Sequence, residues 1–184
     1  GPRGGIILAR DDVWRKKLQS AVFPGVQGSL HTQIIAAKAV CLGEALQPGF
    51  RDYARLIKEN ASVFAERLSE RGLRVVSGGT DTHIVLLDLS PLGLTGKEAE
   101  AMLDKVNITS NKNPIHYDAP NPSAWVGLRL GVSAATTRGF KQDEFRSLAE
   151  VIAGLFLTRT EDAEGEARLK VTDLCNSFPI YGSV

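Results

Sequence analysis

An arginine stands at the centre of a short apolar segment, where its charge needs an explanation. Arg129 lies midway in Gly127-Leu128-Arg129-Leu130-Gly131, a run that predicts a strand with a small-residue turn behind it. Ionised side chains are seldom buried unpaired, and a guanidinium holds a carboxylate through two parallel hydrogen bonds. The segment therefore indicates a clamp for an α-carboxylate. The alternative is an edge-strand arginine that pairs with a carboxylate of the protein itself.

A second candidate site is the glycine-punctuated segment from Phe23 to Ser29, which precedes a predicted helix over about residues 30–45. Backbone N–H groups before a helix N-terminus, together with the helix dipole, suit a phosphate group. An ordinary connecting loop is the alternative for this segment.

Composition excludes several classes of function. The 184 residues include 22 basic and 21 acidic side chains, so charge gives no case for binding nucleic acid or a membrane surface. We expect no transmembrane helix, because no apolar run reaches roughly 18 residues. Cys41 and Cys175 are predicted to be buried free thiols in a reducing compartment. His83 and His116 lack metal-ligand spacing to acidic residues, and no metal is expected.

Hydrophobic periodicity predicts two parts, with the boundary at Gln47-Pro48. The first part should contain a strand over Gly5 to Ala9 and a helix capped by Asp11 or Asp12, followed by the helix over 30–45. The second part should be a small α/β layer domain with a long helix over about 50–71. Its further elements are predicted as strands at 74–76, 83–89, 108–110 and 127–131, a helix with a Thr95–Glu98 capping box, and amphipathic helices around 145–156 and 167–178.

Five segments, taken in order, resemble the C-terminal half of serine hydroxymethyltransferase. They are Gly1-Pro2-Arg3-Gly4-Gly5, Val22-Phe23-Pro24-Gly25-Val26-Gln27-Gly28, Val76-Ser77-Gly78-Gly79-Thr80-Asp81-Thr82-His83, Leu94-Thr95-Gly96-Lys97-Glu98-Ala99 and Asn111-Lys112-Asn113. Each motif alone is weak, whereas the ordered set is specific. The resemblance runs from Gly1 to about Tyr181.

The resemblance implies an α/β enzyme of the aminotransferase-like fold, fold type I, that depends on pyridoxal 5'-phosphate and uses tetrahydrofolate as co-substrate. Residues 1–47 would end the cofactor-binding large domain, and residues 48–184 would form the small C-terminal α/β domain. The family's enzymes are cytoplasmic homodimers or homotetramers whose cofactor site is shared between subunits. The family's cofactor lysine stands just before the segment that matches Gly1-Pro2-Arg3, so we expect this chain to be a fragment that is inactive alone.

The resemblance also implies roles for particular residues, in catalysis and in binding the amino acid, the cofactor phosphate and folate. Arg3 would act electrostatically near the cofactor, and Arg129 would bind the carboxylate of the amino acid. The remaining positions are Gly28 and Ser29 for the phosphate of a neighbouring subunit's cofactor, and Asn113 and Phe23 for the folate pocket.

Departures from the family pattern keep other functions open. Ser29-Leu30 replace a Gly-Pro pair, and Trp125, Val126 and Val132-Ser133 differ beside Arg129. These changes favour a paralogue as the alternative, acting on α-methylserine or as a folate-independent threonine aldolase or transaldolase. A non-catalytic assembly module is the alternative of another class. Arg138 is expected to make a structural ion pair.

Overall fold

The computed structural model describes residues 1–116, 118 and 120–180, and it divides into two compact units, Gly1–Asp52 and Tyr53–Val184. The 23-residue helix α3, Pro48–Glu70, begins in the first unit and continues into the second. Among the described residues, no helix is both long and apolar enough to cross a membrane.

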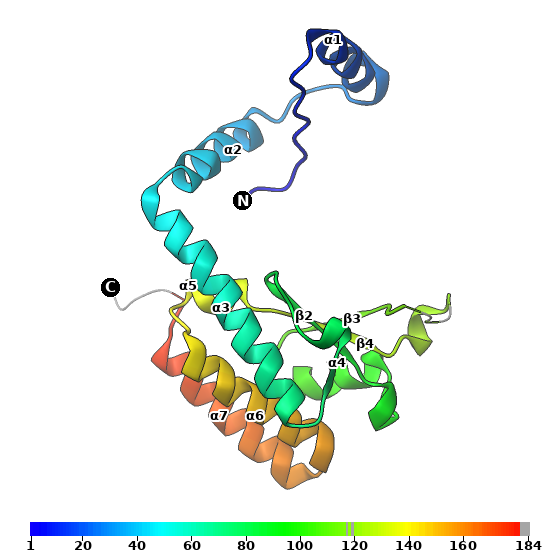
Figure 1. Cartoon of the computed structure of the whole chain (residues 1–184), viewed down its shortest axis with the longest axis vertical. Coiled ribbons are helices and arrows are strands. Elements are labelled where there is room, and N and C mark those ends of the chain that lie inside the picture. Colours follow the sequence, from blue (N-terminus) through cyan, green and yellow to red (C-terminus); the bar gives the residue numbers. More distant parts are fainter. Residues whose placement is uncertain (117, 119, 181–184) are drawn as a thin grey trace. The chain divides into compact units, whose positions relative to one another are not determined.

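The first unit consists of helices and irregular segments (Figure 1). Helix α1, Asp12–Ser20, begins where predicted, because the Asp11 carboxylate accepts a hydrogen bond of 2.7 Å from the Val13 N–H. An irregular helical turn, η1, covers Ala21–Val26 and is kinked at Phe23, and helix α2 covers Thr32–Ala45. The segment from 23 to 29 is therefore partly helical rather than a loop throughout.

The predicted strand from Gly5 to Ala9 is wrong. This stretch pairs with no strand in the described part of the chain. The Gly5 carbonyl accepts a 3.0 Å hydrogen bond from Lys38 Nζ instead. An apolar run forms a strand only where a neighbouring strand accepts its hydrogen bonds.

No described side chain of the first unit is buried, although many are large and apolar. Helix α2 is mostly apolar and carries apolar residues on all of its sides, which is the pattern of a helix enclosed by other polypeptide. The exposed large hydrophobic residues of this unit are Ile6, Ile7, Leu8, Val13, Trp14, Phe23, Val26, Leu30, Ile35, Val40, Leu42, Leu46 and Phe50.

The second unit is built on a four-stranded antiparallel sheet with the order β1-β2-β4-β3. The strands are β1, Arg74–Val75; β2, Ile84–Asp88; β3, Asn111–Asn113; and β4, Gly127–Gly131. Strand β4 has the predicted bounds. Strand β3 starts three residues later than predicted, because Asn107, at a φ of 63°, and the Ile108 N–H close the end of the preceding helix instead.

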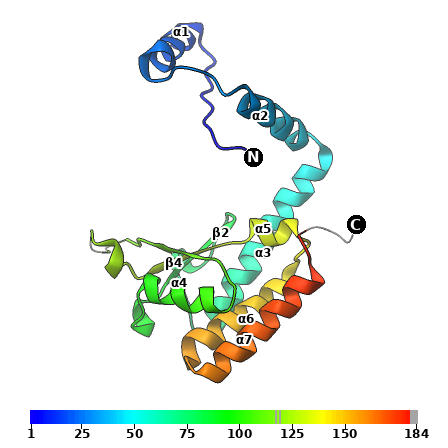
Figure 2. The same ribbon diagram turned by 180° about the vertical axis from the view of Figure 1, so that it is seen from behind.

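On one side of this sheet lie the helices α4 (Gly96–Lys105), α6 (Gln142–Thr158) and α7 (Glu161–Ser177) (Figures 1 and 2). Short turns η2, Val76–Gly78, η3, Ser90–Leu92, and η4, Pro122–Ala124, and the short helix α5, Ser133–Thr137, complete the unit. The core is formed by alternate strand residues and by one face of each long helix. Its largest fully buried side chains include Phe64, Leu68, Val85, Leu87, Leu103, Leu128, Phe145, Ile152 and Phe156.

The two cysteines are free, as predicted, but they are only partly buried. Cys41 lies on α2, in the unit that has no core, and Cys175 lies near the end of α7 at the edge of a cavity. The apolar residues around each cysteine in the sequence predicted that both thiols are buried, but in this chain both are only partly buried.

Candidate active-site face of the sheet

Arg129 lies in the middle of β4 on the face of the sheet turned away from the core. Its neighbours Leu128 and Leu130 are buried, whereas Arg129 is exposed, as the alternation of side chains along a strand requires. The guanidinium is therefore not buried in the core. In the register of the sheet, Arg129 stands between Leu86 of β2 and Asn111 of β3.

Two asparagines share this face with Arg129. Asn111 lies directly opposite Arg129, and Asn113 lies opposite Gly127. Directly opposed residues project on the same side, with Cβ atoms about 5 Å apart, and diagonal neighbours are about 7–8 Å apart. The structure therefore brings Arg129 and Asn113, both predicted from the sequence, to one surface. We call Arg129, Asn111, Asn113 and Leu86 the open face.

The sequence reading missed Asn111, because the strand was placed three residues too early. The alternation of Asn111 and Asn113 around Lys112 was the available signal. The amide of Asn113 donates a 3.0 Å hydrogen bond from Nδ2 to the Pro114 carbonyl, which fixes the orientation of that side chain.

The charges on this side of the sheet are arranged unequally. At the β1 end, Arg74 forms an ion pair with Asp88, which is 2% exposed and lies directly opposite it. Among the described residues, no carboxylate lies within ion-pair distance of Arg129. Within the described residues, Arg129 therefore has no carboxylate partner of the kind that the alternative required. Its guanidinium is available to an anion that is not part of this chain.

The N-terminus of α4 holds the strand that carries Arg129. The Gly96 N–H donates a 2.7 Å hydrogen bond to the carbonyl of Trp125, two residues before β4. A Cβ atom at Gly96 would collide with the Gly127 carbonyl oxygen, and one at Gly127 would collide with the Asn113 carbonyl oxygen. Close backbone approach therefore requires glycine at both positions.

The predicted capping box fixes the start of α4. The backbone N–H of Thr95 and its hydroxyl each donate 2.8 Å hydrogen bonds to the Glu98 carboxylate, and the Glu98 N–H donates 3.2 Å to the Thr95 hydroxyl oxygen. The two bonds that the carboxylate accepts, first the one from the Thr95 backbone N–H and then the one from its hydroxyl, lower the pKa of Glu98 below its ordinary value.

A carboxylate ties the two ends of the connection between β3 and β4. Asp118 Oδ2 accepts hydrogen bonds of 2.9 Å from the Ile115 N–H and 3.2 Å from the Val126 N–H. The bonds draw the exit of β3 toward the entry of β4. The sequence reading missed this residue, because an aspartate in a polar connection is an unspecific signal.

The other predicted site residues belong to the first unit. Arg3, Gly28 and Ser29 are exposed, and Phe23 is 62% exposed. Gly28 and Ser29 lie between η1 and α2, just before the N-terminus of α2, where His31 makes no side-chain capping bond. The positions of these four residues relative to Arg129 and Asn113 are not defined, because the two groups belong to different units. Their roles stay predictions.

Among the described residues, no carboxylate makes the ion pair expected for Arg138. Its Nε donates to the carbonyl of Phe178 at 2.7 Å, and its Nη2 donates to the carbonyl of Cys175 at 3.1 Å. The arginine thus binds one carbonyl in the last turn of α7 and the carbonyl of Phe178, the residue that follows the helix, where carbonyl groups lack partners inside the helix. In the described part of the chain, no three His, Cys, Asp or Glu side chains gather as metal ligands would.

Comparison with known proteins extends over almost the whole chain. Residues 1–152 match the family model described as serine hydroxymethyltransferase. The 2-methylserine hydroxymethyltransferases of Aminobacter sp and Paracoccus sp are 62% and 60% identical, and each alignment covers 98% of this chain and 44% of the relative. The serine hydroxymethyltransferase of Prochlorococcus marinus (strain MIT 9313) is 50% identical over 100% of this chain and 43% of its own length. The chain thus spans less than half of the curated relatives that it matches.

Proposed function

This chain belongs to the serine hydroxymethyltransferase family, and we propose that it is the C-terminal part of a hydroxymethyltransferase that interconverts serine and glycine. The one-carbon unit would pass to and from tetrahydrofolate, and the cofactor would be pyridoxal 5'-phosphate. In this proposal the complete enzyme has fold type I, the first unit completes its large domain, and the second unit is its small domain.

Arg129 carries the proposal. It is exposed, it lies at the centre of β4, and no carboxylate pairs with it among the described residues. A guanidinium in that state suits the α-carboxylate of an amino acid, which it would hold by two charge-assisted hydrogen bonds. Asn113, with donor and acceptor on one amide, would meet the polar edge of the folate ring system, and Phe23 would pack against its plane.

The first unit fits the phosphate group of the cofactor. The first N–H groups of α2 have no side-chain cap, and a Cβ atom at Gly28 would meet nothing within 4 Å, so the approach to this helix end is open. Gly28 and Ser29 would hold the phosphate, and Arg3 would add positive charge near the cofactor. When bound, the cofactor supplies an electron sink for the substrate's α-carbon.

Assembly is part of the proposal. The apolar side chains of α2 and the other exposed apolar side chains of the first unit would be covered by the rest of the subunit and by a second subunit. We propose a homodimer, or a homotetramer made from such dimers, with the cofactor site shared between subunits. Balanced charge and free cysteines fit the cytoplasm.

The comparisons support 2-methylserine as the alternative amino-acid substrate. The relatives that carry that name are 60–62% identical to this chain, whereas the serine hydroxymethyltransferase of strain MIT 9313 is 50% identical.

The test uses the full-length enzyme with pyridoxal 5'-phosphate. Serine, 2-methylserine and threonine are each supplied with and without tetrahydrofolate, and the amino-acid products are quantified. We expect folate-dependent formation of glycine from serine, or of alanine from 2-methylserine. Cleavage of threonine alone, without folate, would indicate an aldolase, and no turnover of any amino acid would indicate an assembly module.

A further inference from the structure

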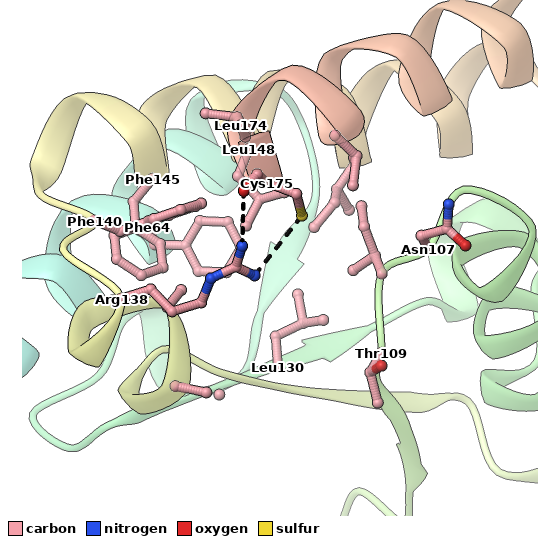
Figure 3. A pocket seen from close by; sticks show the side chains of 16 residues that line it. Phe64, Asn107, Thr109, Leu130, Arg138, Phe140, Phe145, Leu148, Leu174 and Cys175 are labelled. Carbon is pink, nitrogen blue, oxygen red and sulfur yellow. Dashed lines mark hydrogen bonds between the residues drawn. The ribbon is translucent and has the colours of Figure 1, made fainter. Parts of the chain in front are cut away.

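The second unit contains a cavity of about 230 Å³ behind β4 (Figure 3). Apolar side chains from α3, β4, α5, α6 and α7 and from the connections between elements form most of its wall, among them Leu130, Phe140, Phe145, Leu148 and Leu174. Leu130 faces the core, so the cavity and the side chain of Arg129, the preceding residue, lie on opposite faces of the sheet. The cavity is therefore separate from the open face.

One cation lines this apolar cavity. Figure 3 shows the Arg138 side chain reaching toward Cys175, with its guanidinium among the apolar groups. Three hydrogen bonds engage it: the bonds to the Phe178 and Cys175 carbonyls, and a 3.7 Å contact from Nη1 to Cys175 Sγ. A guanidinium has five N–H donors, so two have no partner among the described residues. Among the described residues, no carboxylate lies within ion-pair distance of Arg138.

We propose that this cavity binds a small carboxylic acid with an apolar body, whose carboxylate accepts the remaining N–H groups of Arg138. An apolar cavity of about 150 Å³ accommodates benzene, so the larger volume here has room for a six-membered ring or a branched aliphatic chain with its carboxylate. The positive charge selects an anion, and the aromatic and aliphatic wall selects an apolar body.

The site would act on the strand that carries Arg129. Leu130 and Gly131 of β4, Ala134 and Ala135 of α5, and Leu174 of α7 all line the cavity. A ligand there would fill the space between strand and helices and stabilise their packing. The proposal concerns Arg138 and its cavity, and it stands whether or not the proposed enzymatic function is correct.

Phenylacetate is the probe, and phenylacetamide, which has the same shape without the charge, is its control. Binding to the full-length protein is measured by calorimetry. We expect saturable binding of phenylacetate, and binding of phenylacetamide weaker by roughly tenfold or more, because charge-assisted hydrogen bonds are lost. Equal affinities, or no saturable binding of phenylacetate, would overturn the proposal.

Three variants locate the bound acid. Ala134→Trp fills the mouth of the cavity from an exposed position and should abolish binding, and Arg138→Met should weaken it roughly tenfold or more. Arg138 also binds the end of α7, so the affinity of Arg138→Met is interpreted only if that variant still unfolds cooperatively. If it does not, the affinity of Ala134→Trp decides whether the acid binds in the cavity. Arg129→Met should leave binding unchanged, and a loss there would assign the acid to the open face. Binding to the 184-residue chain but not to the full-length protein would mean that other polypeptide fills the cavity, which also overturns the proposal.

Discussion

Replacing Arg129 by lysine separates a ligand-binding role from a structural one. Lysine keeps the charge but loses the planar fork, so one of the two charge-assisted hydrogen bonds to a carboxylate is lost. Such a bond is worth about 1.5–3 kcal/mol, which corresponds to a roughly tenfold to hundredfold rise in the dissociation constant of the amino acid. Stability should change by no more than about 0.5 kcal/mol, because the side chain is exposed and has no carboxylate partner among the described residues.

Arg74→Lys is the matched control on the same side of the sheet. Arg74 pairs with Asp88, a carboxylate that is 2% exposed, so its loss should lower the melting temperature and leave amino-acid affinity unchanged. Both variants are made in the full-length enzyme. Glycine and serine affinities are measured by calorimetry, and unfolding is followed by circular dichroism. If Arg129→Lys lowers the melting temperature while affinity is unchanged, Arg129 is structural and the assignment of the open face is wrong.

Three further perturbations test local features. Hydrogen bonds from Thr95 lower the pKa of Glu98 in the folded state, so its carboxylate stabilises the fold at pH values above the ordinary glutamate pKa, and this stability is lost as the pH falls through the lowered folded pKa. Glu98→Gln should therefore reduce the fall in melting temperature at acidic pH, and an unaltered pH profile would refute this. Gly127→Ala should destabilise by about 1–3 kcal/mol in urea unfolding, because its Cβ would collide with a backbone carbonyl of β3, whereas Gly154→Ala, in open space on α6, should be neutral or stabilise by about 0.5–1 kcal/mol. Ser29→Val should weaken retention of pyridoxal 5'-phosphate by the full-length enzyme during dialysis, and unchanged retention would remove Ser29 from the phosphate site.

The sequence predicted the second unit well because its signals are local. The capping box of Thr95 and Glu98 needs residues three apart, and the strand from Gly127 to Gly131 shows its alternation within five residues. The helices α6 and α7 have apolar faces that pack onto one core, so periodicity and burial agree. The placement of Arg129 and Asn113 on one face follows from that alternation once the register is known.

Predictions that depended on other polypeptide were wrong or stay predictions. The run from Gly5 to Ala9 has no strand beside it, and Cys41 has no core to enter. Strand β3 was misplaced because Asn107 adopts the left-handed conformation and ends α4, a choice that propensity alone does not settle. The roles of Arg3, Phe23, Gly28 and Ser29, and the domain boundary at Gln47-Pro48, stay predictions.

The lengths of the two outer strands limit how this sheet can meet other molecules. Strand β1 has two residues and β3 has three, and the two longer strands lie between them. Outer strands that short expose few unpaired N–H and C=O groups, so they are poor templates for the addition of a further strand. Edge-to-edge pairing of copies, the usual hazard of an open sheet, is therefore disfavoured in this unit. Subunits that associate through this unit would therefore use the faces of its helices or of its sheet instead of the strand edges.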